Sequence, residues 1–143
     1  EKAQEFVADT LVATRAPALD FIPEVEPGLR VRGTPTAWER VFLNLFLNAA
    51  QVMPKGGAVE IRSRRTDDGL EVTVADQGSG IPVDILSRIF EPHFSTKSAR
   101  AGLGLHIVKT IVEANGGRVS AANRRDTRGA VFTIRIPSGG AER

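Results

Sequence analysis

The longest stretch of helical periodicity in the chain runs from Thr36 to Met53. Apolar residues recur there at intervals of three and four and cover most of the helix circumference, which predicts a deeply buried helix. Thr34 or Thr36 can cap the first turn, because a threonine hydroxyl accepts a hydrogen bond from a free helical amide. Pro54 and Gly56-Gly57 follow the last periodic residue and predict where the helix stops.

Three further segments have helical character. Ala3–Ala13 forms a short amphipathic pattern that ends before Pro17, and a short helix is expected near Val83–Ser87. The third segment is Leu103–Ala114. Asn115-Gly116-Gly117 ends it, because glycine readily adopts the left-handed conformation that closes a helix.

Alternating apolar and polar positions predict strands on both sides of the long helix. Ala58–Arg64 and Leu70–Asp76 alternate in this way, and Asp67-Asp68-Gly69 between them is typical of a hairpin turn. The other strand-like segments are Phe21–Val25 and Leu29–Val31, around Pro27-Gly28, and Arg118–Ala122 with Ala130–Ile136. This order predicts an α+β fold, a two-layer sandwich in which one mixed sheet of about five strands carries the helices on one face.

The length of 143 residues suits a single domain, residues 1–143, with one sizeable core. With 41% apolar and 25% charged residues, the chain has the composition of a soluble globular protein. Its net charge is only +2 and the basic residues are scattered among acids, so no nucleic-acid partner is expected. Arg62, Arg64 and Arg65 are accordingly interpreted as the solvated face of a strand.

Several classes of site are excluded by residue types that the sequence lacks. There is no cysteine, which rules out disulfides, zinc–thiolate sites and thiol nucleophiles, and two histidines, His93 and His106, are too few for a histidine-rich metal site. No apolar run approaches the roughly 20 residues of a membrane span. The opening residues Glu1–Gln4 do not begin a signal peptide and look like a cut inside a longer protein, so a membrane-anchored parent is neither shown nor excluded.

Asn44 and Asn48 are the first candidates for chemistry. Four residues apart on the long helix, they lie on one face, one turn apart, among residues that are otherwise apolar. A buried amide without a partner costs about 1–3 kcal/mol. Amide oxygens suit Mg²⁺, which keeps several waters and takes phosphate oxygens as further ligands. The alternative is that both asparagines are core residues bonded to the backbone.

Asp76 is the second candidate. It continues the alternation of the preceding strand, so its carboxylate is expected on the core face. A carboxylate there needs a partner, and an exocyclic amine such as that of adenine is a suitable one. Alternatively, the carboxylate caps a helix or a turn at the glycine-rich loop. Gly78 and Gly80 in that loop let the backbone turn tightly and approach a flat ring closely.

Gly102-Leu103-Gly104 stands at the start of the last predicted helix and is the third candidate. Its amides, together with the helix dipole, would form an anion site. The alternative is an ordinary junction between loop and helix. Lys97, in the polar segment before it, could reach a phosphate, and is otherwise a solvated side chain.

The order and spacing of these segments resemble the ATP-binding catalytic domain of bacterial sensor histidine kinases. The matching segments are Asn44–Ala49 for the N box, Asp76–Pro82 for the first glycine box, Ile89–Lys97 for the F box, Gly102–Leu105 for the second glycine box and Gly129–Phe132 for the end of the sheet. The likeness spans about Val31 to Pro137 and is greatest to the nitrogen-regulation and dicarboxylate-sensor kinases, which have a brief ATP lid. It implies a Bergerat-type ATP fold, shared with gyrase, heat-shock chaperone and mismatch-repair ATPases.

The resemblance implies ATP and Mg²⁺ as cofactors and assigns roles to residues of this chain. Asn48 would bind Mg²⁺ through the ATP phosphates with Asn44 in support, Asp76 would bind the adenine amine, and Lys97 would reach the phosphates by charge. Asn44, Asn48 and Lys97 are therefore the expected catalytic residues. The further expected nucleotide contacts are Gly78, Gly80, Ile81, Phe94, Arg100, Gly102, Leu103, Gly104, Leu105 and Thr133.

Three positions depart from the usual pattern of the family. Arg100 stands where another glycine often begins the second glycine box, and would stiffen the lid or supply a cation to the triphosphate. Gln51 stands where many relatives have a basic residue, and His93 where the F box usually has phenylalanine. His93 is not taken as the phosphoacceptor, because the family places that histidine on a separate helical dimerisation domain.

The implied reaction transfers the γ-phosphoryl group of MgATP to that histidine. A neutral imidazole has a lone pair available near pH 7 and needs little help from a general base. Hydrolytic members and serine kinases of this fold carry a glutamate where this chain has Asn44, an amide that accepts no proton, and Glu39 falls on another helical face. Hydrolysis is therefore disfavoured. A regulatory ATP sensor and an interaction module with structural glycines are the remaining alternatives.

The resemblance also implies partners: the dimerisation and histidine phosphotransfer domain of the parent kinase, and a response regulator through that domain. Residues 1–16 would form a peripheral helix that follows the missing dimerisation domain. We expect this fragment to be monomeric and its parent to be a homodimer. The use of ATP implies a cytoplasmic domain.

Overall fold

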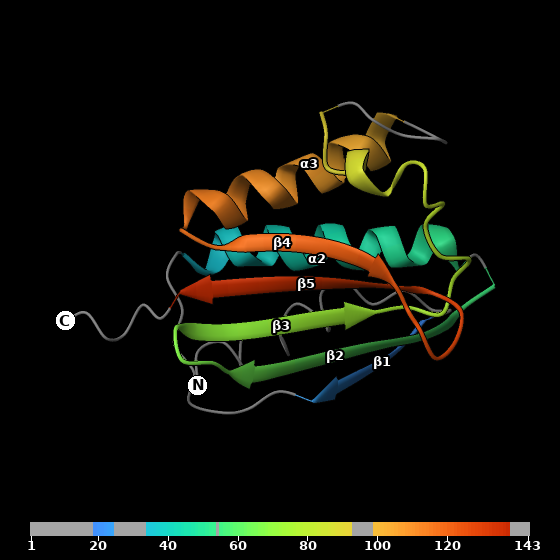
Figure 1. The fold of residues 1–143 in the computed structure, drawn as a ribbon, viewed down its shortest axis with the longest axis horizontal. Coiled ribbons are helices and arrows are strands. Elements are labelled where there is room, and N and C mark those ends of the chain that lie inside the picture. Colours follow the sequence, from blue (N-terminus) through green and yellow to red (C-terminus); the bar gives the residue numbers. More distant parts are fainter. Residues whose placement is uncertain (1–18, 25–33, 54, 93–98, 138–143) are drawn as a thin grey trace.

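The computed structural model describes residues 19–24, 34–53, 55–92 and 99–137. Within these ranges a sheet of five strands carries the long helices on one face, so the expected two-layer α+β sandwich is confirmed (Figure 1). The strands are β1 (Leu19–Glu24), β2 (Gly57–Arg65), β3 (Gly69–Ala75), β4 (Arg118–Asn123) and β5 (Ala130–Pro137). The helices are α2 (Pro35–Val52), α3 (Ala99–Ala114) and the 3₁₀ helix η1 (Leu86–Arg88).

The sheet is mixed, as predicted, and its strand order is β1-β2-β3-β5-β4. β1 runs parallel to β2, and the other neighbouring pairs are antiparallel. The predicted hairpin between β2 and β3 is present, and Thr66 and Gly69 close it with two backbone hydrogen bonds of 2.8 and 3.3 Å. β3 lies between β2 and β5 and is the central strand of the sheet. The residues that follow β3 therefore emerge in the middle of the sheet, at the end where β3 finishes.

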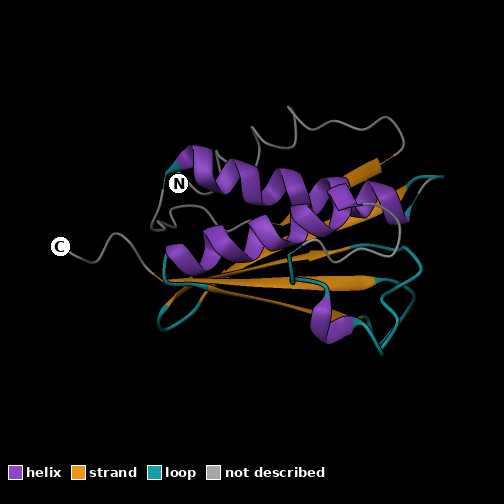
Figure 2. Cartoon of the chain, turned by 90° about the horizontal axis from the view of Figure 1, so that it is seen from above, coloured by secondary structure: helices purple, strands orange, loops and turns teal. Residues whose placement is uncertain are grey.

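α2 begins where the sequence predicts. The Thr34 hydroxyl accepts a hydrogen bond from the Ala37 amide at 3.1 Å, and Pro35 fills the first helical position, where no amide hydrogen is needed. α2 and α3 lie side by side over the sheet (Figure 2). None of the helices in the described ranges is long and apolar enough to cross a membrane.

The hydrophobic core lies between these helices and the inner face of the sheet. Its helical members are Trp38, Val41, Phe42, Leu45, Phe46, Ala49, Leu105, Val108 and Val112. Its strand members alternate along the chain and include Val59, Ile61, Leu70, Val72, Val74, Phe132, Ile134 and Ile136. Full burial of one such large side chain contributes about 1.5–3 kcal/mol. The helix face and the strand end that carry the candidate site therefore border this core.

The start of α3 differs from the sequence-based expectation. The helix begins at Ala99 and not at Leu103, so Gly102 and Gly104 lie inside it. Each glycine inside a helix costs roughly 1 kcal/mol relative to alanine, which is why the sequence predicts a later start. Burial of the apolar face further along the helix, including Val108, offsets that cost.

The short helix expected at Val83–Ser87 is also corrected. Turns cover its first residues, and the helical part is η1, none of whose residues is buried. A segment this short has too little packing to sustain an α-helix. The helix expected at Ala3–Ala13 and the strand expected at Leu29–Val31 lie outside the described residues.

Candidate functional site

Asp76 directly follows β3 and is almost completely buried, with 3% of its surface exposed. Its Oδ1 atom accepts hydrogen bonds from the amides of Gly78 (2.9 Å) and Ala130 (3.1 Å). Its Oδ2 atom has no hydrogen-bond partner among the described residues. The turn interpretation of this carboxylate therefore holds for Oδ1, and the ligand interpretation stays a prediction for Oδ2. Oδ1 closes the turn, and Oδ2 is a buried acceptor that favours a ligand with a hydrogen-bond donor.

The start of β5 fixes Asp76 from one side. The Asp76 amide donates to the Ala130 carbonyl at 2.9 Å, and the Ala130 amide in turn donates to the carboxylate. Gly129 permits this close approach, because a Cβ atom built there would lie 2.0 Å from the Asp76 carbonyl oxygen. The φ angle of Gly129, +120°, also disfavours any other residue.

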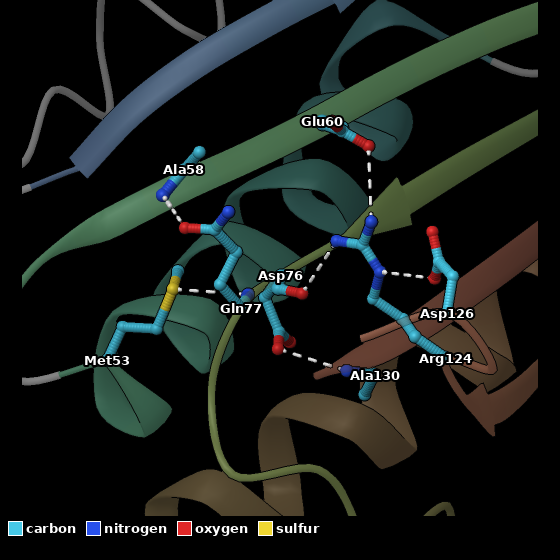
Figure 3. A network of polar contacts seen from close by, with 8 residues as sticks. All are labelled: Met53, Ala58, Glu60, Asp76, Gln77, Arg124, Asp126 and Ala130. Carbon is cyan, nitrogen blue, oxygen red and sulfur yellow. Dashed lines mark hydrogen bonds and ion pairs between the residues drawn. The ribbon is translucent and has the colours of Figure 1, made fainter. Parts of the chain in front are cut away.

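The glycine-rich loop after Asp76 packs on the C-terminal end of α2. A Cβ atom on Gly78 would lie 2.7 Å from both Cγ2 and the carbonyl oxygen of Val52, so this approach requires glycine. Gln77 also holds the loop, both to β2 and to the end of α2 (Figure 3). The side-chain Oε1 atom of Gln77 accepts a hydrogen bond from the backbone amide of Ala58 at 3.0 Å, and the backbone amide of Gln77 donates to Met53 Sδ at 3.3 Å.

One face of α2 connects the three candidate segments. Asn44, Asn48 and Val52 lie four residues apart along this face. Val52 contacts the glycine-rich loop, and at the other end Asn44 Nδ2 donates a hydrogen bond to the Gly104 carbonyl of α3 at 3.2 Å. An α-helix rises about 1.5 Å per residue, so Asn48 lies ~6 Å along the axis from each of its two neighbours on this face. The structure thus places Asn48 between the two glycine segments.

The two asparagines differ in their contacts. Asn44 has the backbone hydrogen bond that the core interpretation requires. Asn48 is half-buried and has no hydrogen-bond partner among the residues that the structure describes. Its amide oxygen is therefore available to a hard cation or to a polar ligand.

The second glycine segment lies inside α3 and not before it. The amides of the N-cap and of the first three residues of an α-helix have no intrahelical partner, and within α3 these three residues are 99–101. The expected position of Gly102-Leu103-Gly104 before the helix is therefore wrong, and none of the three amides belongs to this unpaired set. Gly104 instead borders open space, since a Cβ atom built there would meet no described heavy atom within 4 Å.

Residues 33–140 match the family described as histidine kinase-, DNA gyrase B-, and HSP90-like ATPase. The chain belongs to this ATPase family. The matched range includes Asn48, Asp76 and Gly104, so the three segments that α2 connects all fall within the family's ATPase domain.

The relatives of this ATPase domain include sensor kinases. Sensor histidine kinase ZraS of Klebsiella oxytoca is 38% identical over 133 residues, which are 92% of this chain and 28% of that protein. Among solved structures, the mycobacterial sensor histidine kinase MprB has a TM-score of 0.84 and 32% identity, with 95% of both chains covered. Histidine kinase ThkA in complex with response regulator TrrA has a TM-score of 0.81 and 29% identity, covering 98% of this chain and 41% of that chain. The chain spans about a quarter of the length of the curated relatives it matches.

Leu105 and Thr133, two other residues expected to contact the nucleotide, lie where their side chains are poorly placed to reach it. Leu105 is 8% exposed and belongs to the core, so its side chain is not available to a nucleotide. Thr133 alternates with the buried Phe132 and Ile134 and therefore lies on the face of the sheet away from the helices. The Asp76 carboxylate lies on the inner face of the sheet, as the alternation along β3 requires. Thr133 and Asp76 therefore lie on opposite faces, and the structure does not bring them together.

The remaining expected contacts are only partly described. Gly80 and Ile81 lie in the loop after Asp76, and Ile81 is half-buried. Phe94 and Lys97 lie outside the described residues, as do the side chains of Arg100 and Leu103. The backbone of the latter two forms the first turns of α3. The other two positions that depart from the family are Gln51, which is exposed on α2, and His93, which lies outside the described residues.

Two residues that hold the glycine-rich loop, Asn123 and Arg124, carry only a weak signal in the sequence. Asn123 forms two hydrogen bonds with the backbone of Ile81, and Arg124 donates one to the backbone carbonyl of Asp76. They lie 42 and 48 positions along the chain from these partners. No local pattern predicts such contacts, although an asparagine and an arginine at the end of an otherwise regular strand are a weak sign of a special role.

A separate charged cluster lies on the outer face of the sheet. Glu71 accepts hydrogen bonds from Arg64 Nε at 2.9 Å and Arg135 Nε at 3.1 Å. Burial alone raises the pKa of Glu71, but the hydrogen bonds and charges of Arg135 and Arg64 together lower this pKa below its ordinary value of 4.5. The Arg64 side chain is 65% exposed, which confirms the prediction of a solvated strand face.

Proposed function

We propose that this chain is the ATP-binding catalytic domain of a sensor histidine kinase, and that it transfers the γ-phosphoryl group of MgATP to a histidine on a separate dimerisation domain. The observation that carries the proposal is the buried Asp76 carboxylate, whose Oδ2 atom has no partner among the described residues. Adenine presents an exocyclic amine donor to such an acceptor. Guanine presents a carbonyl oxygen at the corresponding position and would be repelled.

Asn48 and the start of α3 would serve the triphosphate. Mg²⁺ suits the Asn48 amide oxygen, and when bound it neutralises charge on the phosphate oxygens. The unpaired amides at residues 99–101 make the N-terminal end of α3 attractive to anions. The open space beside Gly104 supports a phosphate position between these amides and Asn48. Lys97 and Arg100 remain candidate cations for the same group.

The chemical step needs little from this domain beyond positioning and charge neutralisation. A nitrogen lone pair of the acceptor imidazole forms the new bond to the γ-phosphorus, the bond from that phosphorus to the bridging oxygen breaks, and ADP leaves. Asn44 stands where hydrolytic relatives carry a glutamate, and its amide is already bonded to Gly104. Glu39 is exposed on α2. The isolated domain should therefore bind ATP but hydrolyse it slowly.

The partners follow from the same proposal. The acceptor histidine would belong to a dimerisation and phosphotransfer domain of the parent protein, which would be a homodimer and would pass the phosphoryl group to a response regulator. The complex of the related kinase ThkA with its response regulator TrrA supports this assignment. We place the domain in the cytoplasm because it would use ATP. We assign it to the nitrogen-regulation and dicarboxylate-sensor group because few residues separate Phe94 from Gly102 in the sequence.

The decisive experiment adds γ-labelled MgATP to this chain together with the histidine-bearing dimerisation fragment of its parent. Label should appear on the fragment and disappear when its histidine is replaced by alanine or when this chain carries Asp76→Asn. An unlabelled fragment despite tight ATP binding would indicate a regulatory ATP sensor. Rapid release of free phosphate by this chain alone, lost in Asn48→Ala, would indicate an ATPase.

A further inference from the structure

Asn123, the last residue of β4, binds the end of the glycine-rich loop through both halves of its side-chain amide. Its Oδ1 atom accepts a hydrogen bond from the Ile81 amide at 2.6 Å, and its Nδ2 atom donates to the Ile81 carbonyl at 2.8 Å. Gly80 makes room for this contact, because a Cβ atom there would lie 2.8 Å from Asn123 Oδ1. The φ angle of Gly80 is +85°, so the loop conformation and the asparagine contact depend on the same glycine.

Arg124, the next residue, binds the beginning of the same loop (Figure 3). Its Nη1 atom donates a hydrogen bond to the backbone carbonyl of Asp76 at 3.1 Å. Its Nη2 atom lies 3.6 Å from Glu60 Oε1, and its Nε atom lies 3.7 Å from Asp126 Oδ1. The Arg124 side chain is only 14% exposed. The planar guanidinium serves three acceptors at once, which a lysine ammonium on a flexible stem does less well.

These two residues reach the loop from opposite sides of the sheet. Consecutive residues of a strand point to opposite faces. Glu60, which orients Arg124, alternates with the buried Val59 and Ile61 and so lies on the outer face. Asn123 pairs with the buried Ala130 of β5 and so belongs to the inner side, where Ile81 packs against the core.

The contacts act on the backbone of the loop and not on the Asp76 carboxylate itself. Oδ1 of Asp76 is bonded to two backbone amides, so the direction of Oδ2 follows from where the loop backbone lies. Hydrogen bonds weaken steeply as their angle departs from linear. A misplacement of ~1 Å in a binding or catalytic group can reduce its effect by about 100-fold.

We propose that Asn123 and Arg124 are positioning residues of the adenine site, and that together they determine how strongly Asp76 prefers adenine to guanine. Neither residue needs to contact the nucleotide, because both act through the loop from Asp76 to Ile81. This inference rests on the proposed function, in which Asp76 binds the adenine amine. It adds a specificity-determining pair to that site.

Calorimetric titration of this chain with MgATP and MgGTP tests the inference. Arg124→Ala should weaken MgATP binding by ~10-fold, which corresponds to ~1.4 kcal/mol and to the loss of one hydrogen bond from a charged donor. MgGTP binding should change little, so the ratio of the two affinities should fall. Arg124→Lys should recover part of the ratio, because lysine can still donate to the Asp76 carbonyl. Asn123→Ala should lower the ratio as Arg124→Ala does.

Arg125→Ala is the matched control, since Arg125 carries the same charge, is exposed and makes no hydrogen bond to the loop among the described residues. It should leave both affinities unchanged. Glu60→Gln is a second route to the same test if Arg124→Ala does not fold, because it loosens the guanidinium without removing it. It should lower the affinity ratio by a smaller factor.

Two results would overturn the inference. The first is an affinity ratio like that of the native chain in folded Arg124→Ala and Asn123→Ala. The second is an equal loss of both affinities, which a purely structural role would give. Asp76→Asn separates this outcome from failure of the proposed function. If Asp76→Asn also keeps the native ratio, Asp76 does not read the base and the proposed function fails with it.

Discussion

The side-chain amide of Asn44 donates a hydrogen bond to the backbone carbonyl of Gly104 at 3.2 Å, across 60 positions of sequence. This bond joins the middle of α2 to the first turns of α3. Asn48, one turn further along α2, has no hydrogen-bond partner among the described residues. Two asparagines that look equivalent in the sequence therefore have different roles: Asn44 connects two helices, and Asn48 is available to a ligand.

Asn44→Ala should destabilise the domain without a ligand. A hydrogen bond of this kind contributes about 1 kcal/mol. For a domain of this size, that loss lowers the melting temperature by about 3–5 °C. Thermal unfolding followed by circular dichroism measures the change. Gln51→Ala, at an exposed position on the same helix, is the control and should melt like the native chain. An unaltered melting temperature in Asn44→Ala would show that the bond to Gly104 is not important for stability.

Asn48→Ala should leave the stability of the domain almost unchanged and should weaken the binding of MgATP. Its amide has no described partner to lose, so the melting temperature should stay within ~1 °C of the native value, since substitutions that break no contact have small effects. Affinity for MgATP should fall at least ~10-fold, because even the outer-shell partners of metal ligands contribute that much. Affinity for ATP in the presence of a chelator should not change. An equal loss of affinity with and without Mg²⁺ would argue against a role in metal binding.

Gly104→Ala should stabilise the domain and weaken nucleotide binding at the same time. Alanine is favoured over glycine inside a helix by about 0.8–1 kcal/mol, and a Cβ atom at this position meets no described atom within 4 Å. The same methyl group would enter the space proposed for the phosphates. Melting temperature and MgATP affinity, measured on one preparation, should therefore move in opposite directions. Unaltered affinity would place the phosphates elsewhere.

Gly129→Ala is the contrasting glycine variant. A Cβ atom there would lie 2.0 Å from the Asp76 carbonyl oxygen, so the loop or the start of β5 must move. The positive φ angle alone costs about 1–3 kcal/mol for a residue other than glycine. Both stability and MgATP affinity should fall, as thermal unfolding and calorimetry would detect. A variant with native melting temperature and affinity would contradict the described contact between β5 and Asp76.

The cluster around Glu71 predicts a dependence on pH. Because the pKa of Glu71 is lowered in the folded chain, its stabilising effect is fully present above the ordinary value of 4.5 and is lost as the pH falls through the lowered value. Glu71→Gln should therefore be slightly less stable than the native chain near pH 7 and should match it at strongly acidic pH. The difference should shrink in high salt, since both arginines are largely exposed. Denaturant unfolding across pH measures it, and a difference that grows on acidification would contradict the assignment.

Much of the fold could be predicted because the controlling signals are local. The period of α2, the Thr34 cap and the alternation that places Asp76 on the inner face all act within a few residues, and the structure confirms each. The order of the five strands in the sheet could not be derived in the same way. It depends on pairing between segments that are far apart in the sequence.

The site was predictable only in part, for physical reasons that differ between residues. The sequence predicts too late a start for α3, because the intrinsic cost of Gly102 and Gly104 is outweighed by packing that lies further along the helix. The family resemblance implies Thr133 as a nucleotide contact, but strand alternation places it on the outer face. The roles of Asn123 and Arg124 cannot be predicted from the sequence, because their contacts span more than 40 positions and follow no short motif.

The most direct test of the account is a crystal structure of this chain with Mg²⁺ and a non-hydrolysable ATP analogue. The account predicts that Asp76 Oδ2 lies within hydrogen-bonding distance of the adenine amine, about 2.7–3.2 Å, and that the Asn48 amide oxygen coordinates the metal at about 2.0–2.1 Å. A nucleotide bound elsewhere, or a base that leaves Oδ2 of Asp76 without a donor while Asn48 faces away from the metal, would contradict it.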